Sequence, residues 1–112
     1  MARRLYIAVI SVAIASGVTL AAQDAKQIEE GKKVYEVYNC NKCHRIGGTS
    51  TKLQPLDGVA TKLKPAELRE WIVDAKGMTA KTGATRKPEM KAFTLPKKDV
   101  EALAAYLITL KK

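Results

Sequence analysis

The chain has 112 residues, a formal net charge of +9 and 46% hydrophobic residues, and a chain of this length is expected to form one domain. Its two cysteines and single histidine exclude a zinc site built from Cys and His alone, because such a site needs four ligands. One Trp, one Phe and four Tyr predict a modest core that a bound cofactor or another staple would have to complete.

Residues 1–21 are predicted to be a secretory signal peptide. Arg3 and Arg4 form its positive start, an uncharged run covers 5–20, and small residues precede a cleavage site near 21/22. The run is shorter than the ~20 apolar residues of a spanning helix, so a membrane association is expected only if the segment is not cleaved. Cleavage would leave a domain of residues 22–112 with 18 of the 20 basic side chains and all 11 acidic ones, in the bacterial periplasm.

Three helices are predicted from the spacing of apolar residues. The first covers about 25–38. The second begins at Pro65, a favoured first helical residue, and ends near Gly77. The third begins at Pro96, and its apolar residues form one continuous stripe: Val100, Leu103, Ala104, Leu107 and Leu110.

The segments 45–64 and 76–95 lie between these helices and show neither helical nor strand periodicity. They are rich in Gly, Thr, Pro and Lys. Irregular loops of this length are uncommon in a small domain unless they have a function. An all-α fold whose long loops wrap around a bound group is therefore predicted, with no strands.

The motif CNKCH, residues 40–44, contains both cysteines and the only histidine. A redox-active dithiol would be expected beside a strand–helix–strand pattern, which is absent. A plain disulfide would suit an exported protein, but it does not account for the adjacent histidine. Covalent haem attachment accounts for every position: Cys40 and Cys43 would form thioethers with the vinyl groups, and His44 would bind the iron. The predicted cofactor is one haem c.

The stretches EEGKKVYEVYNCNKCH and DVEALAAYLITLKK extend this pattern beyond the motif. With them, nearly the whole mature chain resembles the small monohaem class I c-type cytochromes of bacteria. The resemblance implies a small cytochrome c fold, all-α, with three to five helices and long loops around one covalently bound haem. It also places Gly31, Tyr35 and Tyr106 where the first and last helices cross. A glycine there would allow close approach.

The resemblance implies that a methionine before the last helix is the second iron ligand. Met90, in KPEMKAFTL, matches this position, whereas Met78, in DAKGMTAKTG, lies just past the second predicted helix without that context. Met78 stays as the alternative ligand, and core filling is the structural role expected of any methionine. A second histidine ligand is excluded because the chain has only one.

Two further haem contacts are implied by the resemblance. Pro55, in LQPLDGV, matches the proline whose carbonyl accepts a hydrogen bond from the axial histidine. Trp71, in LREWI, resembles the tryptophan that packs on the haem and donates its N–H to a propionate. Gln54 and Lys91 depart from the family pattern, and one extra residue between Tyr35 and Cys40 predicts a turn before the motif.

His/Met ligation would saturate the iron and raise its reduction potential, which suits a one-electron carrier of a respiratory chain and not an enzyme. Two alternatives are a dedicated cytochrome subunit of a periplasmic dehydrogenase complex and a haem enzyme or sensor with an open sixth site. The expected partners are a redox donor and an acceptor with acidic docking surfaces, and nucleic acid is not expected. The basic residues expected near the haem are Lys42, Lys52, Lys81, Arg86, Lys87 and Lys91.

Overall fold

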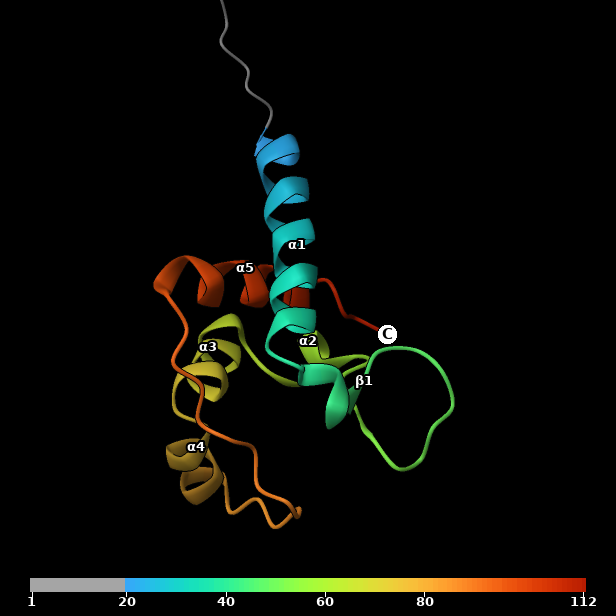
Figure 1. The fold of residues 1–112 in the computed structure, drawn as a ribbon, viewed down its shortest axis with the longest axis vertical. Coiled ribbons are helices and arrows are strands. Elements are labelled where there is room, and N and C mark those ends of the chain that lie inside the picture. Colours follow the sequence, from blue (N-terminus) through green and yellow to red (C-terminus); the bar gives the residue numbers. More distant parts are fainter. Residues whose placement is uncertain (1–19) are drawn as a thin grey trace, which may run out of the picture.

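The computed structural model describes residues 20–112, so the predicted signal peptide, 1–21, lies almost entirely outside the described residues (Figure 1). The described part is mainly helical, as predicted. Its elements are α1 (Leu20–Val37), the single-turn 3₁₀ helix η1 (Cys40–Lys42), β1 (His44–Arg45), β2 (Gln54–Pro55), α2 (Val59–Lys62), α3 (Pro65–Val73), α4 (Ala75–Thr82) and α5 (Lys97–Ile108). No helix of this part is long and apolar enough to cross a membrane.

The crossing of α1 and α5 organises the fold, and α5 runs across α1 in Figure 1. A Cβ at Gly31 would overlap the carbonyl oxygen of Ala102 and lie 2.6 Å from the Cβ of Tyr106. The rings of Tyr35 and Tyr106 pack edge to face, with centroids 6.1 Å apart. These contacts confirm the predicted crossing, because only a residue without a side chain fits at Gly31.

The core lies between α5 and its neighbours α1 and α3. On α5 the buried residues are Val100, Ala102, Leu103, Ala104 and Leu107. Ala102 joins the predicted stripe because it faces Gly31, and Leu110 follows the end of the helix, where it is only partly buried. Leu68 and Ile72 of α3 complete this side of the core.

The second predicted helix is wrong in its extent. It ends at Val73, four residues before Gly77, and a separate helix, α4, occupies 75–82 in the segment predicted to be irregular. Asp74 separates the two helices with φ −145° and ψ 59°, and its carboxylate accepts a hydrogen bond from the N–H of Gly77 at 3.0 Å. Gly77 is therefore in the first turn of α4 and does not end α3.

The segment 45–64 also contains more regular structure than predicted. β1 and β2 form a short parallel pair in which His44 is opposite Gln54, and α2 adds one helical turn. The predicted turn before the motif is confirmed at Tyr38 and Asn39, where Asn39 has φ 57°. This left-handed residue lies between the end of α1 and the start of η1, and asparagine adopts this conformation more readily than most residues.

Candidate cofactor site

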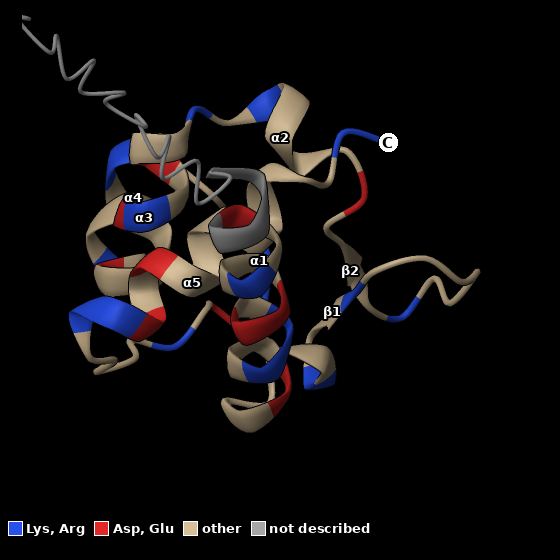
Figure 2. Ribbon diagram, turned by 90° about the horizontal axis from the view of Figure 1, so that it is seen from above, with Lys and Arg blue, Asp and Glu red and all other residues tan. Residues whose placement is uncertain are grey.

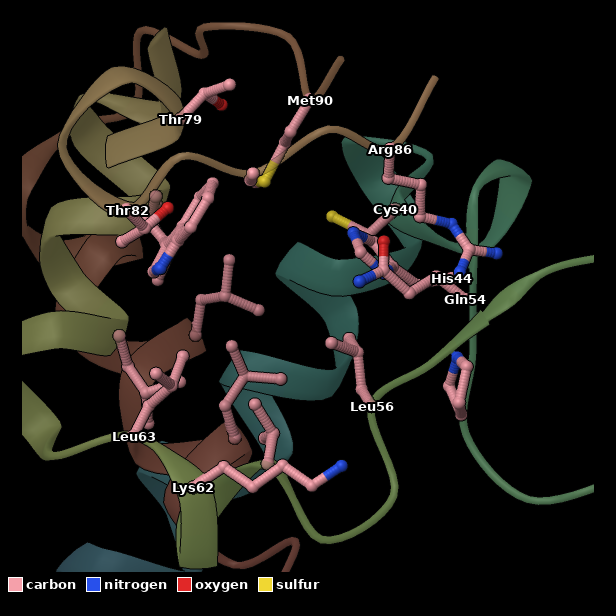
Figure 3. A pocket seen from close by; sticks show the side chains of 18 of the residues that line it. Cys40, His44, Gln54, Leu56, Lys62, Leu63, Thr79, Thr82, Arg86 and Met90 are labelled. Atoms are coloured by element: carbon pink, nitrogen blue, oxygen red, sulfur yellow. The ribbon is translucent and has the colours of Figure 1, made fainter. Parts of the chain in front are cut away.

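A cavity of about 420 Å³ lies between the helices and the segment 84–95 (Figure 3). Leu68, Ile72, Leu103 and Leu107, which are core residues, form part of its wall. One side of the cavity therefore reaches the core of the domain, and exposed residues such as Lys62 and Arg86 lie at its outer side.

The two cysteines follow directly from the turn at Asn39. η1 begins at Cys40, and the N–H of Cys43 donates to the carbonyl of Cys40 at 3.2 Å. Both thiols are free. Cys40 lines the cavity and is half-buried, and burial raises the pKa of its thiol, whereas Cys43 is exposed and is not among the lining residues. One thiol therefore faces the cavity and the other is exposed.

His44 lines the cavity from β1. Its carbonyl accepts a hydrogen bond from the hydroxyl of Tyr35 at 3.2 Å, which ties β1 to α1. Burial lowers the pKa of the imidazole, the positive charge of Arg86 lowers it further, and the backbone of Gln54 opposes the shift. The ring is consequently neutral near pH 7, the form in which an imidazole nitrogen binds a metal.

The imidazole Nδ1 is buried and has no partner at hydrogen-bond distance and angle within residues 20–112. The residue opposite His44 in the strand pair is Gln54, and Pro55 is opposite Arg45. Pro55 lines the same cavity, but its carbonyl as the acceptor for His44 stays a prediction.

Met90 and Met78 occupy different environments. Met90 is half-buried on the segment before α5, and its sulfur points into the cavity (Figure 3). Met78 lies within α4 with an exposed fraction of 4% and is not among the residues that line the cavity. The structure thus brings Met90 together with Cys40 and His44, and places Met78 in the packed interior.

Trp71 reaches the cavity from α3 and is half-buried. Polar side chains that line the cavity and that the sequence did not single out are Asp57, Lys62, Thr79, Thr82 and Glu89. Arg86, predicted only as a surface charge, lines the cavity as well.

Lys62, Thr79 and Thr82 were missed because they depend on α2 and α4, which were not predicted. A signal for α4 was Asp74 three residues before Gly77, the spacing of an N-cap and its donor.

The basic side chains are spread over helices and loops and do not gather on one element (Figure 2). The six predicted ones are all exposed. Lys81 pairs with Glu70 at 3.6 Å and Lys87 with Glu89 at 2.8 Å. Lys42, Lys52, Arg86 and Lys91 form no ion pair with another described residue, so their charges are available to a partner.

Comparison with known proteins identifies the family. The Cytochrome c family model matches residues 28–111, a stretch that includes CNKCH, Met90 and all of α5. No curated protein matches the chain, and no solved structure matches it. Members of this family carry haem c attached covalently through cysteine sulfurs, and Cys40 and Cys43 stand in the corresponding motif. With most of its length matched, the chain belongs to the cytochrome c family.

Proposed function

We propose that this protein is a periplasmic one-electron carrier whose haem c is attached through Cys40 and Cys43 and ligated by His44 and Met90. One observation carries the proposal: Cys40, His44 and Met90 line one apolar cavity although Met90 is far from the motif in sequence. A methionine from a loop before the last helix reaches the same space as the motif histidine.

The residues present fit a haem. The wall is largely apolar, a thiol and a neutral imidazole stand at the cavity, and a thioether sulfur points into it. Imidazole and thioether are suitable ligands for haem iron, and together they favour electron transfer over binding of a substrate. When bound, the haem supplies an iron centre that gains and loses one electron.

Residues of the protein would keep other ligands and water away from this iron. His44 and Met90 would bind the iron, and the apolar wall from α3 and α5 would keep water away. Tyr35 fixes the backbone of His44 through its hydroxyl.

The partners would be redox proteins with acidic docking surfaces. The unpaired charges of Lys42, Lys52, Arg86 and Lys91 support this, since they attract acidic surfaces over several ångströms. Association with an acidic partner is expected to slow as salt is added, because surface charges are screened.

A free carrier is favoured over a permanent subunit of a dehydrogenase. The strongly exposed large hydrophobic residues of the described part are Val37 of α1, 71% exposed, and Val73 of α3, 53% exposed. They belong to separate helices, whereas a permanent subunit interface would need a contiguous apolar patch.

The proposal is tested by the visible spectrum of protein matured in a bacterial periplasm. Sharp bands of low-spin haem c when reduced, and the weak long-wavelength iron–sulfur band when oxidised, are expected. Met90→Ala should remove the iron–sulfur band, while the matched Met78→Ala should keep it and lose stability only. A high-spin spectrum of the unsubstituted protein would overturn the proposal in favour of an open sixth site.

A further inference from the structure

After β1, which contains His44, the chain forms a loop over residues 46–53. It then returns as β2 beside His44. In Figure 1 the loop between β1 and β2 projects away from the helices. On its return, the N–H of Gln54 donates to the carbonyl of Cys43 at 2.9 Å, and the N–H of Leu56 donates to the carbonyl of Arg45 at 2.9 Å. These bonds place Gln54 opposite His44. A strand pair of two residues is too short to be stable without further support.

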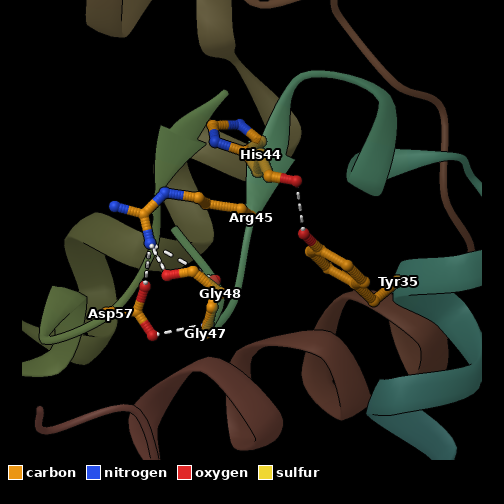
Figure 4. A network of polar contacts seen from close by, with 6 residues as sticks. All are labelled: Tyr35, His44, Arg45, Gly47, Gly48 and Asp57. Carbon is orange, nitrogen blue, oxygen red and sulfur yellow. Dashed lines mark hydrogen bonds and ion pairs between the residues drawn. The ribbon is translucent and has the colours of Figure 1, made fainter. Parts of the chain in front are cut away.

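That support comes from Arg45 and Asp57 at the base of the loop (Figure 4). The Nη1 of Arg45 lies 3.3 Å from the Oδ2 of Asp57, and it donates to the carbonyls of Gly48 at 3.1 Å and Gly47 at 3.3 Å. The other oxygen of Asp57 accepts the N–H of Gly47 at 2.7 Å. Arg45 and Asp57 thereby bond both to each other and to the start of the loop.

Both glycines have φ 71°, a left-handed backbone that other residues adopt at a cost. In this conformation the chain turns so that the carbonyls of both Gly47 and Gly48 accept hydrogen bonds from the guanidinium of Arg45. The side chains of Arg45 and Asp57 are only 26% and 31% exposed. An ion pair that is partly shielded from water and shares hydrogen bonds is stronger than a typical surface pair.

The position of this pair relative to the cavity matters more than its strength. Arg45 follows His44 directly, and Asp57 lines the cavity two residues after Pro55. The imidazole itself lacks a hydrogen bond at Nδ1 within the described chain. The group of the returning strand that acts on the ring is the backbone of Gln54, which lies opposite His44 and raises the pKa of the imidazole. The base of the loop holds that strand.

We propose that Arg45 and Asp57 are a positioning pair, which fixes the orientation of the His44 imidazole by holding β2 beside it. The inference rests on the proposed function, in which His44 binds iron. Tyr35 holds the backbone of His44 from the side of α1, and the pair holds the opposite side. The orientation of an axial imidazole sets how unpaired spin is distributed over an oxidised haem, so it can be read from the hyperfine-shifted haem methyl signals in proton NMR.

The test is Arg45→Lys in the haem-loaded protein. The substitution keeps the charge but loses the planar guanidinium that contacts one carboxylate and two carbonyls together. Arg69→Lys is the matched control, because Arg69 makes a similar pair with Glu101 at 3.1 Å that joins α3 to α5. Arg69→Lys is expected to lower the folding equilibrium constant by up to about fivefold, and Arg45→Lys by at least as much. Only Arg45→Lys should change the order or the spread of the haem methyl signals.

Lys52→Gln tests the effect of charge alone. Lys52 is an exposed residue of the same loop without an ion pair among residues 20–112, and its loss should leave the methyl signals in place. If Arg45→Lys leaves them unchanged, or if Arg69→Lys or Lys52→Gln moves them as far, the positioning role is overturned. Should Arg45→Lys fail to mature, Asp57→Glu, which keeps the charge and lengthens the side chain, replaces it with the same expected outcome.

The two proposals fail differently. Absence of the iron–sulfur band in the unsubstituted protein would contradict the proposed function before any variant is compared. An unchanged methyl pattern in Arg45→Lys, with that band intact, would contradict only the positioning role.

Discussion

At the scale of single residues, Gly31 determines how closely α1 and α5 approach. A methyl group there would meet the backbone of Ala102 and the Cβ of Tyr106, neither of which can rotate away. Gly31→Ala is expected to lower the free energy of unfolding by about 1–3 kcal/mol, as overpacking does in other cores. Urea denaturation of the haem-loaded protein would measure it.

Lys33→Ala is the control for this prediction. Lys33 is on the same helix and its side chain is 69% exposed, so its replacement should change the free energy of unfolding by less than about 0.5 kcal/mol. Equal stability of Gly31→Ala and the unsubstituted protein would show that the crossing adjusts to an added methyl group.

Ionisation of the Tyr35 hydroxyl is expected to make the stability of the protein depend on pH in the alkaline range. Its side chain is 8% exposed, and burial raises the pKa of its hydroxyl to about 12. Because the pKa in the folded state is above the unfolded value of 10.0, the folded state keeps this proton more tightly. Its contribution is complete below pH 10 and is lost as the pH rises towards 12.

Tyr35→Phe is therefore expected to have two effects. At neutral pH it removes one hydrogen bond to the carbonyl of His44, which costs about 1 kcal/mol. Above pH 10 its free energy of unfolding should fall less steeply than that of the unsubstituted protein. Urea midpoints at neutral and alkaline pH measure both effects, and parallel declines would refute the titration of Tyr35 as a cause.

At the scale of elements, the stability of α4 depends on Asp74, the residue that precedes the helix. Asp74 caps the helix by accepting the N–H of Gly77, and α4 carries Thr79 and Thr82 on the cavity wall. Asp74→Ala is expected to cost about 1 kcal/mol, whereas Asp74→Asn, which keeps an acceptor oxygen, should cost less. Thermal unfolding distinguishes them, and equal losses in both variants would assign the effect to the negative charge.

The boundary between α3 and α4 shows why part of the fold could not be predicted from the sequence. Leu68, Ile72 and Ala75 continue one apolar stripe across the break, and all three are buried. Periodicity alone thus indicates a single helix. Gly77 is the residue type that often ends a helix, yet it lies inside α4, where a Cβ would displace the capping carboxylate of Asp74.

The candidate site was predictable to a different degree. Cys40, Cys43 and His44 lie within five consecutive positions, so their chemistry can be recognised without a fold. Met90 as a ligand is implied by the resemblance to the family, from its place before the last helix. Lys62 and Thr82 reach the cavity only because α2 and α4 pack where they do, and no local pattern marks residues whose role depends on such packing.

At the scale of the whole molecule, the cavity lies beside the core and occupies space that packed side chains would otherwise fill. Core residues of α3 and α5, among them Leu68 and Leu107, face it. Without haem the half-buried apolar residues of its wall, such as Leu56, Leu63 and Trp71, would face water, at about 25 cal/mol for each Å² of apolar surface. The apoprotein is therefore expected to be largely unfolded.

A variant carrying both Cys40→Ala and Cys43→Ala tests this expectation, because it cannot attach haem covalently. Far-ultraviolet circular dichroism should show most of the helical signal lost, with the matured unsubstituted protein as the reference. A full helical signal in the variant would mean that the polypeptide alone specifies the fold.

The packing of α1 on α5 has a consequence for the order of events during maturation. The hydroxyl of Tyr38 donates to Asp99 at 3.3 Å across 61 positions of sequence, and the N–H of Ala60 reaches the carbonyl of Leu110 at 3.0 Å. The segment CNKCH is thus enclosed only by contacts with residues far from it in the chain. A prosthetic group can be attached while the exported polypeptide is still open, and the packing of α5 and the residues after it then completes the enclosure.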